Sequence, residues 1–88
     1  MKVWNMGGRS GKVANQFIIH DDEGNNFFQS YSSIIAKIDR GGSVTLDEIY
    51  WDYSRTTSKY RAQFLGESTE RTRRKIKSGE YKLANLNS

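Results

Sequence analysis

The sequence predicts an α+β fold in which a small antiparallel sheet, made of an N-terminal hairpin plus short strands, carries two or three helices on one face. Three observations favour it. Apolar and polar residues alternate ahead of a turn-forming segment at 21–25, apolar residues follow the turn, and helical apolar spacing appears over 31–38. Helix-start and helix-stop residues then bracket two segments at 56–66 and 68–79. The 88 residues predict a single domain, 1–88, with the order β-β-α-β-α-α-β.

The N-terminal third predicts a loop followed by a hairpin. Residues 5–12 hold three glycines within five positions, which favours a flexible glycine-rich loop. Val13, Phe17 and Ile19 then follow a strand-like pattern. Because Gly and Asn tolerate positive φ, the segment 21–25 predicts a turn, and residues 12–31 predict a β-hairpin.

The middle of the chain predicts a helix and a short strand. Tyr31, Ile34, Ile35 and Ile38 are spaced i, i+3, i+4 and i+7, which places them on one helical face. The glycines at 41 and 42 would end this helix. The apolar residues at 44 and 46 then indicate a short strand.

The C-terminal third predicts two helices and a final extended segment. The first begins near Thr56 or Thr57 and stops at Gly66. Ser68 is a good N-cap for the second, which Gly79 closes. The apolar residues at 81, 83 and 86 suggest a terminal strand or an extended tail packed on the domain.

Composition narrows the class of protein. The chain has no cysteine, which favours a reducing compartment, and no apolar run near the roughly 20 residues that span a bilayer. We therefore expect a cytoplasmic protein with no membrane partner. The net charge is +4, and the basic residues concentrate between Lys59 and Lys82. Such a cluster indicates an anionic partner, although a solvated helix face explains it equally well.

Candidate binding residues come from this basic segment and from an aromatic cluster before it. On the helix predicted over 68–78 only Ile76 is a strong apolar anchor, so we expect the basic side chains to be exposed and able to contact phosphates. Interleaved aromatic and basic residues over 50–61 can stack bases and hold phosphates. Trp51 and Tyr60 are expected in the core. The predicted partner or nucleic-acid site comprises Arg71, Arg74, Lys75, Lys77, Tyr53, Arg55 and Lys59.

Residues 57–78 also resemble a helix-turn-helix, because two short helices meet at Gly66 with Ala62 four residues earlier. The pattern departs from that motif at Glu67, Thr72 and Lys75, where apolar residues are expected. An ordinary helical hairpin packed on a sheet is the alternative.

No pattern in the chain supports catalysis, a metal site or a cofactor. The segment 7–12 is one residue short of a phosphate-binding loop, and Val13 replaces its Ser or Thr. The acidic run after His20 predicts a solvated turn better than a metal site. With one histidine and no cysteine, nucleophile–base pairs are hard to build, so we do not expect an enzyme.

Several short segments carry a resemblance to a family of small uncharacterised bacteriophage proteins. They are residues 28–36, 51–54, 56–61, 64–66 and 76–81, within the range Phe28 to Asn87. The resemblance implies a phage accessory protein, and such proteins often block host machinery, including CRISPR and other defences.

Two functional expectations follow from these patterns. The first is a non-catalytic phage-type inhibitor in the host cytoplasm that binds a host protein, a protein–nucleic acid complex, or the DNA, RNA or nucleotide that the complex uses. The second is a DNA-binding regulator that uses residues 57–78.

Overall fold

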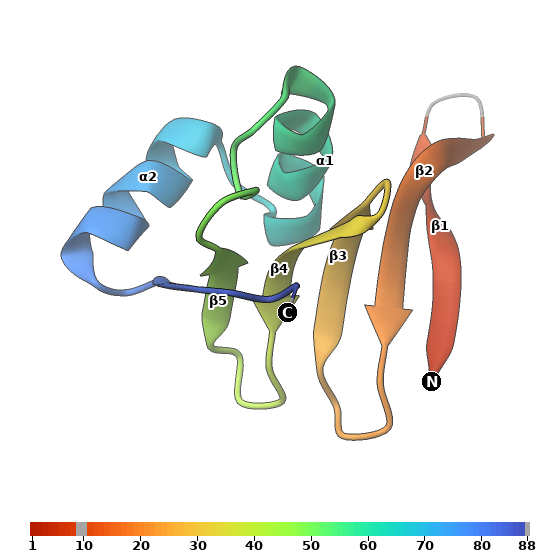
Figure 1. Cartoon of the computed structure of the whole chain (residues 1–88), viewed down its shortest axis with the longest axis horizontal. Coiled ribbons are helices and arrows are strands. Elements are labelled where there is room, and N and C mark those ends of the chain that lie inside the picture. Colours follow the sequence, from red (N-terminus) through yellow and green to blue (C-terminus); the bar gives the residue numbers. More distant parts are fainter. Residues whose placement is uncertain (9–10, 88) are drawn as a thin grey trace.

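A computed structural model describes residues 1–8 and 11–87 of the chain (Figure 1). In these residues six strands form one sheet, ordered as in the sequence, and two helices follow the fifth strand. The elements are β1 (Lys2–Gly8), β2 (Gly11–His20), β3 (Asn26–Ser30), β4 (Ser33–Ile38), β5 (Val44–Asp47), α1 (Arg55–Leu65), α2 (Thr69–Ser78) and β6 (Lys82–Ala84). The α+β class with a small sheet is confirmed, and the helix count is two.

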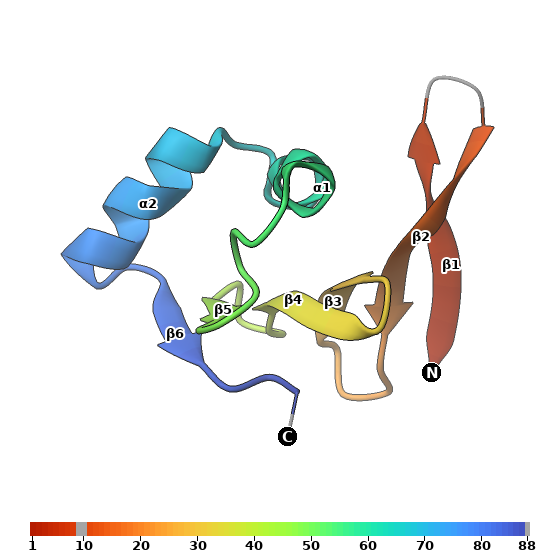
Figure 2. The same cartoon turned by 45° about the horizontal axis from the view of Figure 1, so that its top comes forward.

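The sheet is antiparallel from β1 to β5, and β6 pairs with β5 in parallel. A parallel neighbour needs a long crossover connection, which the two helices provide. Figure 2 shows α1 and α2 on one side of the sheet and the C-terminal segment on the other. Neither helix in the described residues is long and apolar enough to cross a bilayer.

The predicted hairpin over 12–31 is confirmed as β2 and β3, joined by a turn at 21–25. Asp21 organises that turn by accepting hydrogen bonds from the backbone N–H groups of Glu23 and Asn25, both at 2.9 Å. The prediction of a loop over 5–12 is largely wrong. Residues 5–8 end β1 and residues 11–12 begin β2, while positions 9 and 10 lie outside the described residues. The glycines at 7, 8 and 11 therefore belong to the strands β1 and β2.

The helix predicted over 31–38 is wrong, because β4 occupies this segment. Isoleucine is β-branched and favours strands, and β3 and β5 pair with the two edges of β4. A β-bulge opposite Phe28 and Gln29 adds one residue to β4, so consecutive residues Ile35 and Ala36 are both fully buried. This bulge produced an apolar spacing that imitates a helix.

Both C-terminal helices are confirmed, with the predicted caps Gly66, Ser68 and Gly79, whereas the cap Ser54 was not predicted and α1 begins at Arg55. Ser54 and Ser68 accept hydrogen bonds from the N–H groups of Thr57 and Arg71, and Gly66 and Gly79 end the helices in the left-handed conformation. The helix α1 packs on the sheet where the ring of Phe64 lies 5.9 Å from that of Phe28. This contact holds α1, which carries several residues of the candidate site, against the sheet.

Candidate functional site

Arg61, on α1, is fully buried and joins three parts of the chain. Its Nη1 atom donates to the backbone oxygen of Trp51 and, at 3.2 Å, to Oδ1 of Asp52. Its Nη2 atom donates to Oγ1 of Thr69 at 2.6 Å, and its guanidinium lies 5.1 Å from the centre of the Trp51 ring. Arg61 therefore holds the loop 48–54 and the start of α2 against α1.

Asp52 is neutralised from two sides. Besides Arg61, Nη2 of Arg73 approaches Oδ2 of Asp52 at 3.1 Å, and Ser58 donates its hydroxyl to Oδ1. Burial acts to raise the pKa of Asp52, but the hydrogen bonds from Ser58 and Arg61 and the charges of both arginines lower it below its ordinary value. Asp52 is therefore ionised at neutral pH, and its negative charge neutralises Arg61 and Arg73.

A shallow, open hollow of about 540 Å³ lies beside Asp52. Arg55 and Lys59 are four residues apart on α1 and thus share a helix face along it. Tyr53 also lines the hollow and is 46% exposed. Since Asp52 is already paired, the uncompensated charge here is positive and favours an anion. The lining residues are Asp52, Tyr53, Ser54, Arg55, Ser58, Lys59, Ala62 and Thr69.

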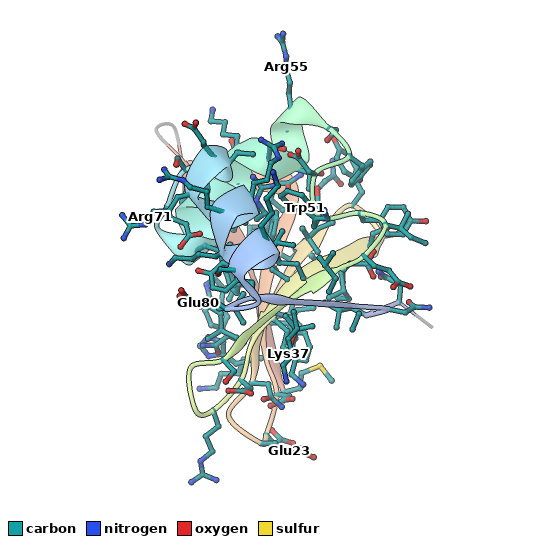
Figure 3. All side chains as sticks on the ribbon, turned by 90° about the vertical axis from the view of Figure 1, so that its left-hand side faces the viewer. Glu23, Lys37, Trp51, Arg55, Arg71 and Glu80 are labelled. Atoms are coloured by element: carbon teal, nitrogen blue, oxygen red, sulfur yellow. The ribbon has the colours of Figure 1, made fainter. Side chains whose placement is uncertain are left out.

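A second cationic surface, the α2 face, consists of Arg71, Arg74 and Lys77. All three residues are exposed, and none forms an ion pair within the described part of the chain. Figure 3 shows Arg71 projecting sideways from α2, whereas Arg55 projects beyond the start of α1. The hollow and the α2 face are therefore two neighbouring patches that point in different directions.

Lys75 does not belong to the α2 face, contrary to the expectation that it points away from the domain. Its Nζ atom lies 2.9 Å from Oε1 of Glu67 and 3.7 Å from Oε2 of Glu80. Tyr81 and Thr72 also donate to Glu67, each at 2.7 Å. Burial acts to raise the pKa of Glu67, but these three donors lower it. A buried carboxylate needs a cation, and Lys75 supplies it.

The aromatic predictions are confirmed in their placement. Trp51 and Tyr60 pack, partly buried, against the core, while Tyr53 and Arg55 are exposed. The partnership of Arg61 with Asp52 was missed by sequence reasoning. Its only signal was a basic residue one position after a core aromatic, on the inner side of a predicted helix.

The two successive helices expected for a helix-turn-helix are present, joined by residues 66–68. The inner side of α2 is formed by the buried Thr72 and the partly buried Ile76, so a polar residue stands where that motif has an apolar one. Entry of α2 into a DNA groove stays a prediction.

The segments considered as a phosphate-binding loop or a metal site have structural roles instead. The segment 7–12 includes two positions outside the described residues and otherwise belongs to strands. The His20 ring packs edge-on against Trp4, with ring centres 4.5 Å apart. Within residues 1–8 and 11–87, no group of three or more His, Asp and Glu side chains is arranged to hold a metal ion.

The family of the chain is given by its sequence. No curated protein and no solved structure matches it. A family model described as "Family of unknown function (DUF8033)" matches residues 1–80, which include all five antiparallel strands and both helices. That description names neither a phage nor an activity. The match covers most of the 88 residues, so the chain belongs to the DUF8033 family of unknown function.

Proposed function

We propose that this chain is a small non-catalytic protein that binds the phosphates of nucleic acid held by a host defence complex, and thereby blocks that complex. One observation carries the proposal. Three cations near the helix pair, Arg61, Arg73 and Lys75, are neutralised by carboxylates of the fold. The cations of the hollow and of the α2 face are exposed and form no ion pairs among the described residues.

Phosphate is the anion that these groups suit best. Arginine can bind it through two parallel hydrogen bonds, and lysine adds a point charge. Each phosphate that a protein neutralises releases counterions, so several exposed cations spaced along two helices would give strong, salt-dependent binding. The phage context comes from the resemblance of residues 28–87, because phage accessory proteins often act on host defences in the host cytoplasm.

Binding is tested with a fluorescent duplex of about 20 base pairs, titrated at several salt concentrations. The double variants Arg55→Ala/Lys59→Ala and Arg71→Ala/Arg74→Ala should each weaken binding and reduce the slope of log K against log salt by about two. The control Lys2→Ala/Arg40→Ala removes the same charge elsewhere and should change the slope much less. Equal effects of all three would show that only net charge matters, which contradicts the proposal.

Inhibition is tested in bacteria that carry an active CRISPR system directed against a phage. Expression of the chain should restore phage plating, and the charge-reversed variant Arg71→Glu/Arg74→Glu should not. A folded, expressed chain that protects the phage against none of a panel of defence systems would count decisively against an inhibitory role.

A DNA-binding regulator is the second candidate, favoured by the directly connected helices α1 and α2 and the exposed arginines of α2. It differs in sequence selectivity. Selection from a random duplex library should enrich one consensus if the chain is a regulator, and Arg71→Ala should relax that consensus. Binding without enrichment supports the first proposal.

A further inference from the structure

The sheet has a second face that neither helix covers. Phe28 on β3 faces α1, and successive residues of a strand point to opposite faces, so Phe27 points to the other side. The register places Ile19 and Lys37 beside Phe27, and Val3 beside Ile19, all on that side. Figure 2 shows the helices on one side of the sheet and the C-terminal segment on the other.

This uncovered face carries an apolar and aromatic patch on β1, β2 and β3. Phe17 belongs to it as well, because it lies two residues before Ile19. Val3 is 56% exposed, and Phe17, Ile19 and Phe27 are partly exposed. The C-terminal segment crosses this face over β5 and β4, where Leu86 and Asn87 donate to Asp47 and Asn87 also bonds to the backbone of Ile34.

Two lysines carry positive charge on this face, and the carboxylate of Asp21, in the turn between β2 and β3, interacts with one of them, Lys37. Nζ of Lys37 lies 5.9 Å from the centre of the Phe27 ring, and Lys82 continues the same row across the sheet through Thr45. Asp47 is the carboxylate that the described strands place on this side. It is only 1% exposed and accepts bonds from four donors of the fold, so it opposes an approaching anion weakly.

We propose that this sheet face binds single-stranded nucleic acid by stacking bases on Phe17 and Phe27, with Lys37 and Lys82 holding the backbone. Phe17 and Phe27 are diagonal neighbours on adjacent antiparallel strands, and such residue positions lie about 7–8 Å apart, so each ring can stack a separate base. The combination of aromatic rings with flanking cations fits a partner that has both π-faces and negative charge, which an apolar protein surface does not.

Two polar side chains, those of Asn5 and Gln29, lie on the strands beside Phe17. The amide of Asn5 donates to the backbone oxygen of Val13 at 3.0 Å, and that of Gln29 donates to the backbone oxygen of Tyr31 at 2.7 Å. One N–H group of each amide is thus engaged within the fold. Stacking alone tolerates any base, so this face should bind single strands with little sequence preference.

The test measures anisotropy of a fluorescein-labelled oligothymidine of about ten nucleotides. The wild-type chain should bind it, and Phe17→Leu/Phe27→Leu, which keeps apolar bulk but removes the rings, should weaken binding at least about tenfold. Lys37→Ala should lower the salt slope by about one. Trp4→Leu, at a 44% exposed aromatic residue on the other face of β1, is the matched control and should leave oligothymidine binding unchanged.

A second variant covers the case in which the double leucine chain does not fold. Val3→Glu adds a negative charge to an exposed position of the patch, and Ile49→Glu adds the same charge at a position 65% exposed in the loop 48–54. Only Val3→Glu should weaken oligothymidine binding. If the wild-type chain does not bind oligothymidine, the inference is wrong. It is also wrong if Phe17→Leu/Phe27→Leu and Val3→Glu both bind oligothymidine as tightly as the wild type.

The outcomes also separate this inference from the proposed function. Duplex binding that depends on Arg71 and Arg74 would survive the loss of Phe17 and Phe27. The chain could also sediment as a dimer that Val3→Glu dissociates, and bind no oligothymidine. That result would assign the face to self-association and overturn the inference.

Discussion

Arg61 is the residue on which the position of the candidate site depends. We expect Arg61→Met to destabilise the fold by about 3 kcal/mol, because it leaves Asp52 and Thr69 without their buried donor. The value is at the lower end for broken buried pairs, since Asp52 keeps Arg73 and its side chain is 27% exposed. Urea unfolding measures the change.

Arg73→Met is the matched control, because Arg73 contacts the same carboxylate and the same Trp51 ring. Its side chain is 51% exposed, so we expect a loss below about 1 kcal/mol. Equal losses in the two variants would show that burial does not govern the strength of these pairs.

A buried pair of hydroxyl groups connects the sheet to α1. Ser30 and Thr57 are fully buried, and their hydroxyls share a hydrogen bond of 2.9 Å between β3 and α1. Thr57→Val should cost about 1–3 kcal/mol, because it leaves the Ser30 hydroxyl without its partner. Adding Ser30→Ala should recover part of the loss, since no unpaired group remains. Additive losses in this double-mutant cycle would contradict a direct interaction.

At the scale of elements, the connection between α1 and α2 depends on Gly66, which has a φ of 72° and ends α1. A Cβ atom there would meet no heavy atom within 4 Å, so the cost of Gly66→Ala comes from backbone conformation alone. We expect about 1 kcal/mol, measured by thermal unfolding. Gly7→Ala also meets no atom within 4 Å, but its φ is not positive, so it should change stability little. If Gly66→Ala does not lower the thermal stability, Gly66 is not the residue that ends α1 in the left-handed conformation.

For the whole molecule, acid should unfold the chain mainly through three carboxylates, besides Asp21 of the turn, whose pKa is also lowered by its hydrogen bonds with Asn25. The pKa values of Asp47, Asp52 and Glu67 are lowered by hydrogen bonds that outweigh the opposing effect of burial. A lowered pKa contributes stability above the unfolded value, here 3.8 for Asp and 4.5 for Glu, and loses it as pH falls through the folded value. Stability should therefore be constant near neutrality and fall below about pH 4.5.

The midpoint of thermal unfolding, measured from pH 7 to pH 3, checks this expectation. Glu67→Gln should lower stability at neutral pH and make the acid dependence shallower, because one of the three titrating groups is gone. A midpoint that does not change between pH 5 and pH 3 would contradict the lowered pKa values.

The local signals in the sequence determined much of the fold. Turn residues at 21–25, the capping serine at 68, and terminal glycines at 66 and 79 act through their immediate neighbours, so the hairpin and both helices could be predicted. Exposure of Tyr53, Arg55, Arg71, Arg74 and Lys77 followed from the small apolar content of these segments.

Tertiary structure decided the rest, because it depends on partners distant in the chain. The segment 33–38 is a strand since β3 and β5 pair with its two edges, and Lys2–Gly8 is a strand through pairing with β2. Lys75 is internal because folding brings Glu67 and Tyr81 to it, and Arg61 is buried because Asp52 and Thr69 lie within reach. A charge is free or neutralised according to what folding places beside it, which local sequence does not encode.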